Sequence, residues 1–99
     1  MKIYVAFTCD AWNTYNSARL LFVGTSVSKL TRVISNEIEN ANIEYNNDST
    51  KPLVQAKTFR RDMRDRKSLW KDHPETLLSY INPRLKYAFI ECYDNNSEC

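Results

Sequence analysis

The segment from Cys9 to Arg19 holds the densest mixture of side chains that could recognise a ligand. A carboxylate, two aromatic rings, a hydroxyl and a guanidinium are supplied there by Asp10, Trp12, Tyr15, Ser17 and Arg19. A small polar-aromatic ligand or the hot spot of a protein partner would require such acceptors, stacking surfaces and bidentate donors. The alternative is a structural role, in which Trp12 folds back onto its scaffold and Asp10 satisfies the local backbone. The sequence leaves both interpretations open.

A second candidate is the basic segment 57–71, which contains seven Lys or Arg residues and two acids. Phe59 and Trp70 interleave with these cations, as in surfaces that bind single-stranded nucleic acid by charge and stacking. The alternative is a solvated helix face whose Asp62 and Asp65 already pair with neighbouring cations. The cations that we single out for binding nucleic acid are Arg60, Arg61, Arg64 and Lys67.

Side chains suited to catalysis or metal binding do not gather in this sequence. The single histidine, His73, precedes Pro74, where a capping or surface role explains it. Cys9 could be a nucleophile in a small hydrolase if its pKa were lowered, but a small buried thiol is the commoner case. The acidic run 37–48 has no histidine and no calcium-loop signature, and a single glycine cannot form a phosphate-cradling loop. We therefore predict no enzymatic activity, no metal and no cofactor.

Bulk properties predict one soluble domain over residues 1–99. Hydrophobic residues make up 42% of the 99-residue chain, enough for one core but not for two. The net charge of +2 is small, although the acidic run 37–48 and the basic segment 57–71 polarise the chain. Three cysteines without Cys-x-x-Cys spacing indicate reduced thiols, and no stretch has the length and apolarity of a membrane span or signal peptide.

Hydrophobic periodicity predicts an α+β fold in the order ββαααβ. Strands are expected at residues 2–8, 18–24 and 85–93, and helices at 27–40, 52–66 and 74–81. A three-stranded antiparallel sheet in the order 2-1-3, covered on one face by the 27–40 helix, is the simplest assembly of these elements. The segment between Cys9 and Ser17 would then form a long hairpin tip.

The expected elements also make local predictions. In the first strand Ile3, Val5 and Phe7 alternate with smaller or more polar residues, which makes one face more apolar and in need of a cover. Residues 44–51 have the composition of a surface loop. In the second helix, i,i+4 ion pairs are expected between Arg61 and Asp65 and between Asp62 and Arg66. The predicted apolar positions of that helix are Leu53, Ala56, Phe59 or Arg60, and Met63.

Several motifs resemble a known group of sequences. They are Thr-Cys-Asp-Ala-Trp at 8–12, Leu-Leu-Phe-Val-Gly-Thr-Ser at 20–26, Gln-Ala-Lys-Thr-Phe-Arg-Arg-Asp at 55–62, Ile-Asn-Pro-Arg-Leu-Lys-Tyr-Ala-Phe at 81–89 and Tyr-Asp-Asn-Asn-Ser-Glu at 93–98. With these motifs the chain resembles small uncharacterised accessory proteins of tailed phages and prophages over most of its length. None of the motifs is diagnostic of a reaction.

The resemblance implies a setting and a mode of action. Such accessory proteins act by binding in the cytoplasm of the infected bacterial host, where they inhibit a defence complex or host enzyme or sequester a nucleotide-like ligand. We accordingly expect a non-enzymatic binding protein with a host protein or a small nucleotide-like ligand as partner. A nucleic-acid-binding module that uses the basic segment 57–71 is the alternative. A homo-oligomer is also predicted, because an exposed apolar second strand would gain from burial.

Overall fold

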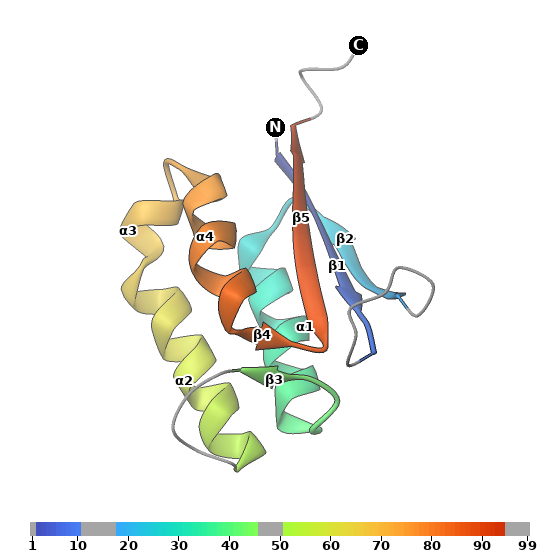
Figure 1. Cartoon of the computed structure of the whole chain (residues 1–99). Helices are drawn as coiled ribbons and strands as arrows, with labels where there is room; N and C mark the ends of the chain where they lie inside the picture. Colours follow the sequence, from blue (N-terminus) through green and yellow to red (C-terminus); the bar gives the residue numbers. More distant parts are fainter. Residues whose placement is uncertain (1, 11–17, 46–50, 95–99) are drawn as a thin grey trace.

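Three antiparallel strands form the main sheet of the computed structural model, which describes residues 2–10, 18–45 and 51–94 (Figure 1). Strand β1 (Lys2–Thr8) lies between β2 (Arg19–Gly24) and β5 (Ala88–Asp94), so the order is β2-β1-β5. All seven residues of β1 pair with β5, and Val5 stands opposite Val23 on one side and Glu91 on the other. The α+β class and the predicted strand order are confirmed.

The helices cover the face of the sheet that carries Tyr4 and Ala6, which are 2% and 0% exposed. Ile3, Val5 and Phe7 lie on the opposite face and are only partly buried. The more apolar face of β1 is therefore not the covered one, contrary to the expectation from alternation. The helices cover the face that carries Ala6 because its small side chain leaves room for the large aliphatic residues of the helix layer.

Helix α1 (Val27–Glu39) packs against this face. Ser26 caps its first turn, because its Oγ accepts a hydrogen bond from the Lys29 backbone N–H at 3.2 Å. Leu30, Ile34 and Ile38 are each at most 1% exposed, and burying each aliphatic side chain stabilises the fold by about 1.5–3 kcal/mol. The predicted helix and its apolar stripe are thus confirmed over these turns.

Three further helices follow α1 along the chain. Helix α2 (Pro52–Asp65) packs on α1 through Ala56, Phe59 and Met63, whereas Leu53, which was predicted to be buried, is 51% exposed. The short α3 (Lys67–Trp70) was not expected as a separate element, and α4 (Pro74–Ile81) has the predicted bounds. A 3-10 turn, η2 (Asn82–Arg84), links α4 to the C-terminal strands.

No helix in the described part of the chain is long and apolar enough to cross a membrane.

A second, two-stranded ladder was missed by the sequence prediction. Strand β3 (Glu44–Tyr45) pairs with β4 (Leu85–Lys86), although residues 44–51 were expected to form a loop. The expected single strand 85–93 is divided into β4 and β5 at Tyr87, whose φ of 68° lies in the left-handed region. This break turns β4 away from the main sheet and toward β3.

Tyr45 joins this small ladder to α2. Its side chain is 1% exposed, and its ring lies edge-on to Phe59 with the ring centroids 5.2 Å apart. Its hydroxyl donates to Asp62 Oδ2 at 2.8 Å, and its backbone N–H donates to Gln55 Oε1 at 3.2 Å. A buried phenol needs such a partner, because an unpaired hydroxyl in a core is costly. Tyr45 therefore holds β3, and through it β4, against α2.

We expect the substitution Tyr45→Phe to lower the free energy of unfolding by about 1.5–3 kcal/mol, since it removes a hydrogen bond to a charged acceptor. Tyr93→Phe is the matched control, because the Tyr93 hydroxyl donates to Glu91 at 2.9 Å in an exposed setting. That change should cost less than about 0.5 kcal/mol. Urea unfolding followed by circular dichroism measures both, and equal losses would contradict the role assigned to Tyr45.

Candidate functional site

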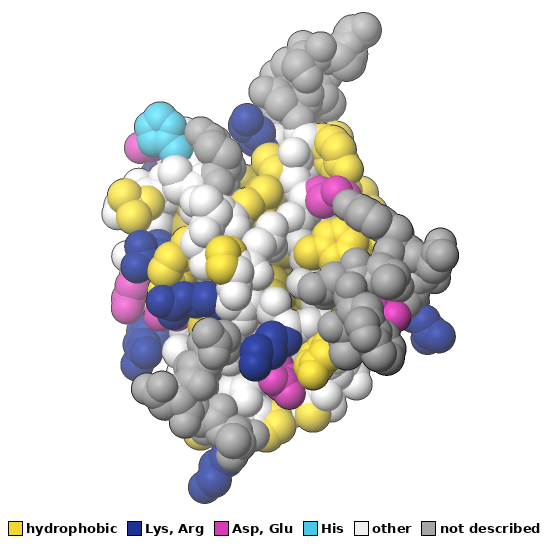
Figure 2. Space-filling view, viewed as in Figure 1, with side chains coloured by type: hydrophobic (Ala, Val, Ile, Leu, Met, Phe, Trp, Pro, Cys, Tyr) yellow, Lys and Arg dark blue, Asp and Glu magenta, His cyan; other side chains and the backbone are white. Residues whose placement is uncertain are grey.

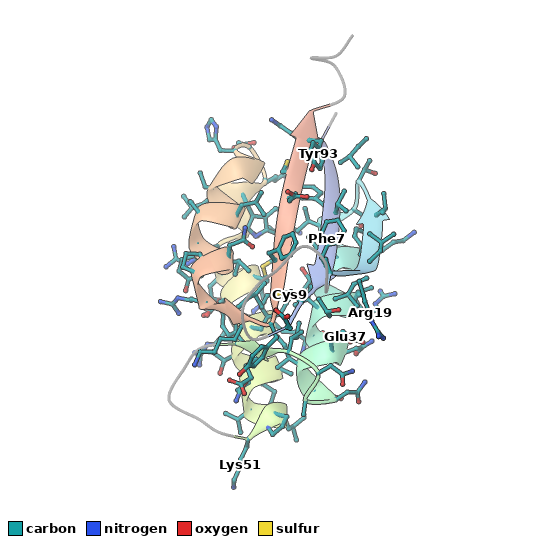
Figure 3. All side chains as sticks on the ribbon, turned by 45° about the vertical axis from the view of Figure 1, so that its right-hand side comes forward. Phe7, Cys9, Arg19, Glu37, Lys51 and Tyr93 are labelled. Carbon is teal, nitrogen blue, oxygen red and sulfur yellow. The ribbon has the colours of Figure 1, made fainter. Side chains whose placement is uncertain are left out.

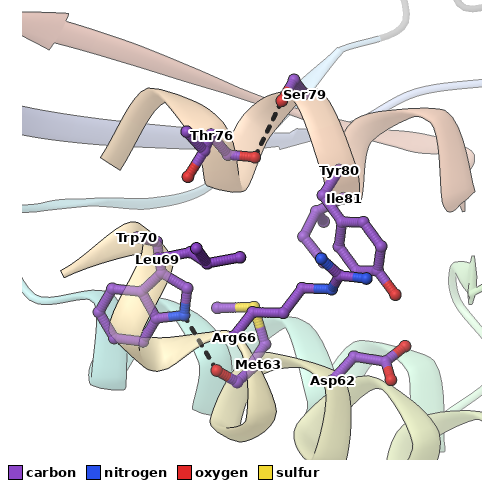
Figure 4. Close-up of a pocket in the computed structure, with 9 residues that line it drawn as sticks. All are labelled: Asp62, Met63, Arg66, Leu69, Trp70, Thr76, Ser79, Tyr80 and Ile81. Atoms are coloured by element: carbon purple, nitrogen blue, oxygen red, sulfur yellow. Dashed lines mark hydrogen bonds between the residues drawn. The ribbon is translucent and has the colours of Figure 1, made fainter. Parts of the chain in front are cut away.

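Two neighbouring hollows share Met63 and Trp70 in their linings. The first, here called the basic groove, has a volume of about 260 Å³ and lies where α2 and α3 face the start of α1. It is lined by Ser28, Thr31, Arg60, Met63, Arg64, Lys67 and Trp70. The second, the interhelical pocket, has a volume of about 300 Å³ and lies between α2, α3 and α4 (Figure 4).

Trp70 is held in a defined position by the end of α2. Its indole Nε1–H donates to the backbone carbonyl of Met63 at 2.9 Å, and the residue is half-buried. This bond becomes available because α2 ends at Asp65 and α3 folds Trp70 back toward it. Since the indole N–H is occupied, Trp70 offers a ligand its ring faces rather than a donor.

The basic groove collects cations from one stripe of α2 and α3. Arg60, Arg64 and Lys67 follow one another at spacings of four and three residues, and Figure 2 shows Lys and Arg side chains gathered over α2 and α3. The hydroxyl groups of Ser28 and Thr31 line the same groove from α1. The first turn of α1 adds partial positive charge from its backbone N–H groups.

The ion pairs of these cations are exposed and weak. Arg60 Nη1 lies 3.5 Å from Glu39 Oε2, and Arg64 Nε lies 3.8 Å from Asp65 Oδ1. Within the described ranges, Lys67 has no ion-pair partner. Exposed pairs of this kind contribute about 0–1 kcal/mol, so an incoming anion could replace the carboxylates at little cost.

The interhelical pocket has apolar walls and one available cation. Met63, Leu69 and Ile81 supply aliphatic surface, and Figure 4 shows Trp70 and Tyr80 on either side of the space between α3 and α4. The Arg66 guanidinium stacks 3.6 Å from the centroid of the Tyr80 ring. Within the part of the chain that the structure describes, this guanidinium has no hydrogen-bonding or ion-pair partner.

Asp62, at the edge of this pocket, already has partners. It accepts the hydrogen bond from Tyr45, and its Oδ2 lies 3.9 Å from Arg84 Nη1. Burial, followed by this hydrogen bond to Asp62, raises the pKa of Tyr45, so the phenol stays protonated and keeps donating. The predicted pair between Asp62 and Arg66 is therefore replaced by one with Arg84.

The predicted pair between Arg61 and Asp65 is also absent from the described residues, because Asp65 lies beside Arg64 instead.

Two of the predicted hairpin residues, Asp10 and Arg19, line a third hollow at the end of the hairpin where β1 stops and β2 starts. Its volume is about 570 Å³, and Figure 3 places Cys9 and Arg19 near Glu37 there. This hollow, here called the hairpin base, is wide and of mixed charge. Its lining residues are Thr8, Cys9, Asp10, Arg19, Leu20, Leu21, Glu37 and Asn42.

The remaining hairpin candidates, Trp12, Tyr15 and Ser17, lie outside the described residues.

The hairpin base and the basic groove are separate sites. Ser28 and Thr31 of the first turns of α1 line the groove, whereas Glu37 of its last turn lines the hairpin base. The structure brings Arg60 and Arg64 together in the groove but leaves Arg61, exposed on the same helix, outside its lining.

Sequence reasoning did not assign Tyr80 or the α1 residues Ser28 and Thr31 to a site. Arg60, Arg64 and Lys67 were predicted to bind nucleic acid, and their helical spacing, visible in the sequence, places them on one cationic stripe. No comparable signal marked Ser28, Thr31 or Tyr80, because only the packing of α1 on α2 and of α4 beside α3 places them there.

The chemistry available in these sites is recognition by charge, stacking and hydrogen bonding. The pKa of the Cys9 thiol is raised by burial and by the neighbouring Asp10 carboxylate, which disfavours the nucleophilic thiolate. In the described ranges, no group of three or more His, Cys, Asp and Glu side chains could hold a metal ion.

No family model, curated protein or solved structure matches the chain.

The raised pKa of Cys9 predicts slow alkylation. In a Cys92→Ser/Cys99→Ser variant, iodoacetamide should modify Cys9 more slowly at pH 8 than it modifies a free cysteine peptide. A thiol with the ordinary pKa of 9.0 is half ionised at pH 9, whereas the alkylation rate of Cys9 should keep rising above that pH because its pKa is higher. Mass spectrometry over a pH series measures this rate. Asp10→Asn in the same background should speed the reaction, and a rate above that of the peptide at pH 8 would instead indicate an activated nucleophile.

Proposed function

We propose that the protein acts by binding, and that it sequesters a nucleotide-like ligand whose phosphate occupies the basic groove. The observation that supports this most strongly is the meeting of Arg60, Arg64 and Lys67 around one hollow beside Trp70. A phosphate group carries charge and acceptor oxygens that suit guanidinium and ammonium donors. A planar base suits the face of an indole ring.

The energetic balance favours an anion in the groove. Arg60 and Arg64 would exchange weak, exposed contacts with Glu39 and Asp65 for charge-assisted hydrogen bonds to phosphate. The hydroxyl of Thr31 donates to the Val27 carbonyl at 2.8 Å, so its proton is not offered to the phosphate. The cations thus supply most of the attraction, and α1 supplies shape and partial charge.

Trp70 would contribute to the affinity through stacking. Its bond to the Met63 carbonyl fixes the ring before a ligand arrives, so little side-chain freedom is lost on binding. Stacking of a base on an aromatic side chain contributes about 1–3 kcal/mol. Charge and stacking together are sufficient for a small ligand and need no catalytic group.

The resemblance to phage accessory proteins supports a biological role for such binding. A small protein that removes a nucleotide signal in the cytoplasm of an infected bacterium would weaken a host response. The hairpin base, which includes Asp10 and Arg19, would then be available to bind a host protein. An inhibitor of a host defence complex or host enzyme would need such a second surface.

Single-stranded nucleic acid is the second candidate ligand. Lys57 and Arg61 of α2, and Lys71 just after α3, are exposed outside the groove, so a longer polyanion could reach them. Such a ligand would show affinity that falls steeply with added salt, because several phosphate contacts release counterions. A mononucleotide would depend on salt less strongly.

The matched pair Arg64→Ala and Arg61→Ala tests the proposal. Both residues are exposed arginines of α2, but only Arg64 lines the groove. By isothermal titration calorimetry at low salt, Arg64→Ala should weaken binding of nucleoside monophosphates and pyrophosphate by roughly tenfold or more, since one charge-assisted contact is lost. Arg61→Ala should change affinity less than about twofold.

Two outcomes would contradict this assignment. If the wild-type protein binds none of these phosphate compounds at low salt, the function is not phosphate recognition. If a single-stranded oligonucleotide binds and both variants weaken it equally, the second candidate replaces the first.

A further inference from the structure

We propose that the interhelical pocket holds the base of the ligand and that Arg66 selects guanine over adenine. This inference rests on the proposed function, because the base and the phosphate belong to one nucleotide. The phosphate would lie in the basic groove, and the base in the neighbouring interhelical pocket.

The position and size of the pocket suit a base. It shares Met63 and Trp70 with the basic groove, so the two hollows are neighbours. Its volume of about 300 Å³ lies at the lower end of small-molecule sites, which is room for one planar ring system. Figure 4 shows the apolar side chains of Leu69 and Ile81 bordering this space. These walls would contact the faces of a planar ring.

Arg66 gives the pocket a preference among bases. Its guanidinium is stacked on the Tyr80 ring at 3.6 Å, which restricts its plane while leaving its N–H donors open. Guanine presents two adjacent acceptors, O6 and N7, which a guanidinium binds with two parallel hydrogen bonds. Adenine presents N7 next to an amino donor, so one of the two contacts would place donor against donor.

The other polar groups of the pocket also favour guanine. The hydroxyl of Thr76 donates to the His73 carbonyl at 2.7 Å, and that of Ser79 donates to the Thr76 carbonyl at 2.9 Å. Both oxygens keep lone pairs, so they can accept from the ring N–H and amino groups of guanine. Asp62 is already engaged by Tyr45 and Arg84, which leaves Arg66 as the available charge of the pocket.

Calorimetry on the full chain with GMP, AMP, guanosine and pyrophosphate tests this inference. We expect GMP to bind about tenfold or more tightly than AMP, the discrimination that a bidentate arginine–guanine contact provides. Arg66→Ala should abolish this preference while pyrophosphate binding stays within about twofold of wild type. Arg66→Lys keeps the charge without the two-pronged donor and should also lose most of the preference. Lys71→Ala, outside both hollows, is the control and should retain the preference.

The outcomes separate this inference from the proposed function. Equal affinity for GMP and AMP, with pyrophosphate bound, would overturn guanine selection and leave phosphate binding in place. Guanosine bound without any affinity for pyrophosphate would overturn the proposed function instead. A folded Arg66→Ala or Arg66→Lys variant with unchanged preference would show that Arg66 is not the selecting residue. If neither variant folds, the wild-type comparison of GMP with AMP still decides the preference.

Discussion

The buried Tyr45 side chain sets the arrangement on which the candidate site depends. A phenol in a core requires a hydrogen-bond partner, and Asp62 of α2 is that partner here at 2.8 Å. Gln55 of the same helix binds the Tyr45 backbone, so two turns of α2 are tied to β3. Because β3 pairs only with β4 among the described strands, this connection also fixes the C-terminal ladder relative to α2.

The same network positions the residues that recognise a ligand. Asp62 contacts Arg84 of η2, and the Arg84 guanidinium lies 4.6 Å from the centroid of the Tyr80 ring of α4. Arg66, one turn beyond Asp62, stacks on that ring at 3.6 Å. This partly exposed polar cluster links α2 to α4 and η2, and so helps to set the width of the pocket beside Trp70. The basic groove, which also includes Trp70, depends instead on the packing of α1 against α2.

Local sequence patterns predicted the elements better than their contacts. Some signals lie within a single element: the alternation of residues 2–8, the aliphatic stripe of α1, and Pro74 at the start of α4. The structure has these three elements where they were expected. Tyr45 was assigned to a loop because Asn and Asp dominate its neighbourhood, and only its pairing with Leu85, far along the chain, makes it a strand residue. Arg60 and Arg64 were identified from charge, but Ser28 and Tyr80 reach the site through tertiary packing, which no local pattern encodes.

We propose that phosphate-bearing ligands bind beside Trp70 and not at the hairpin base. A titration of the ¹⁵N-labelled protein with GMP, followed by two-dimensional NMR, tests it most directly. We expect the largest shift changes at the amides of residues 28–31 and 60–70 and at the Trp70 indole N–H. Changes confined to residues 8–10 and 19–21, or none at saturating ligand, would contradict the account.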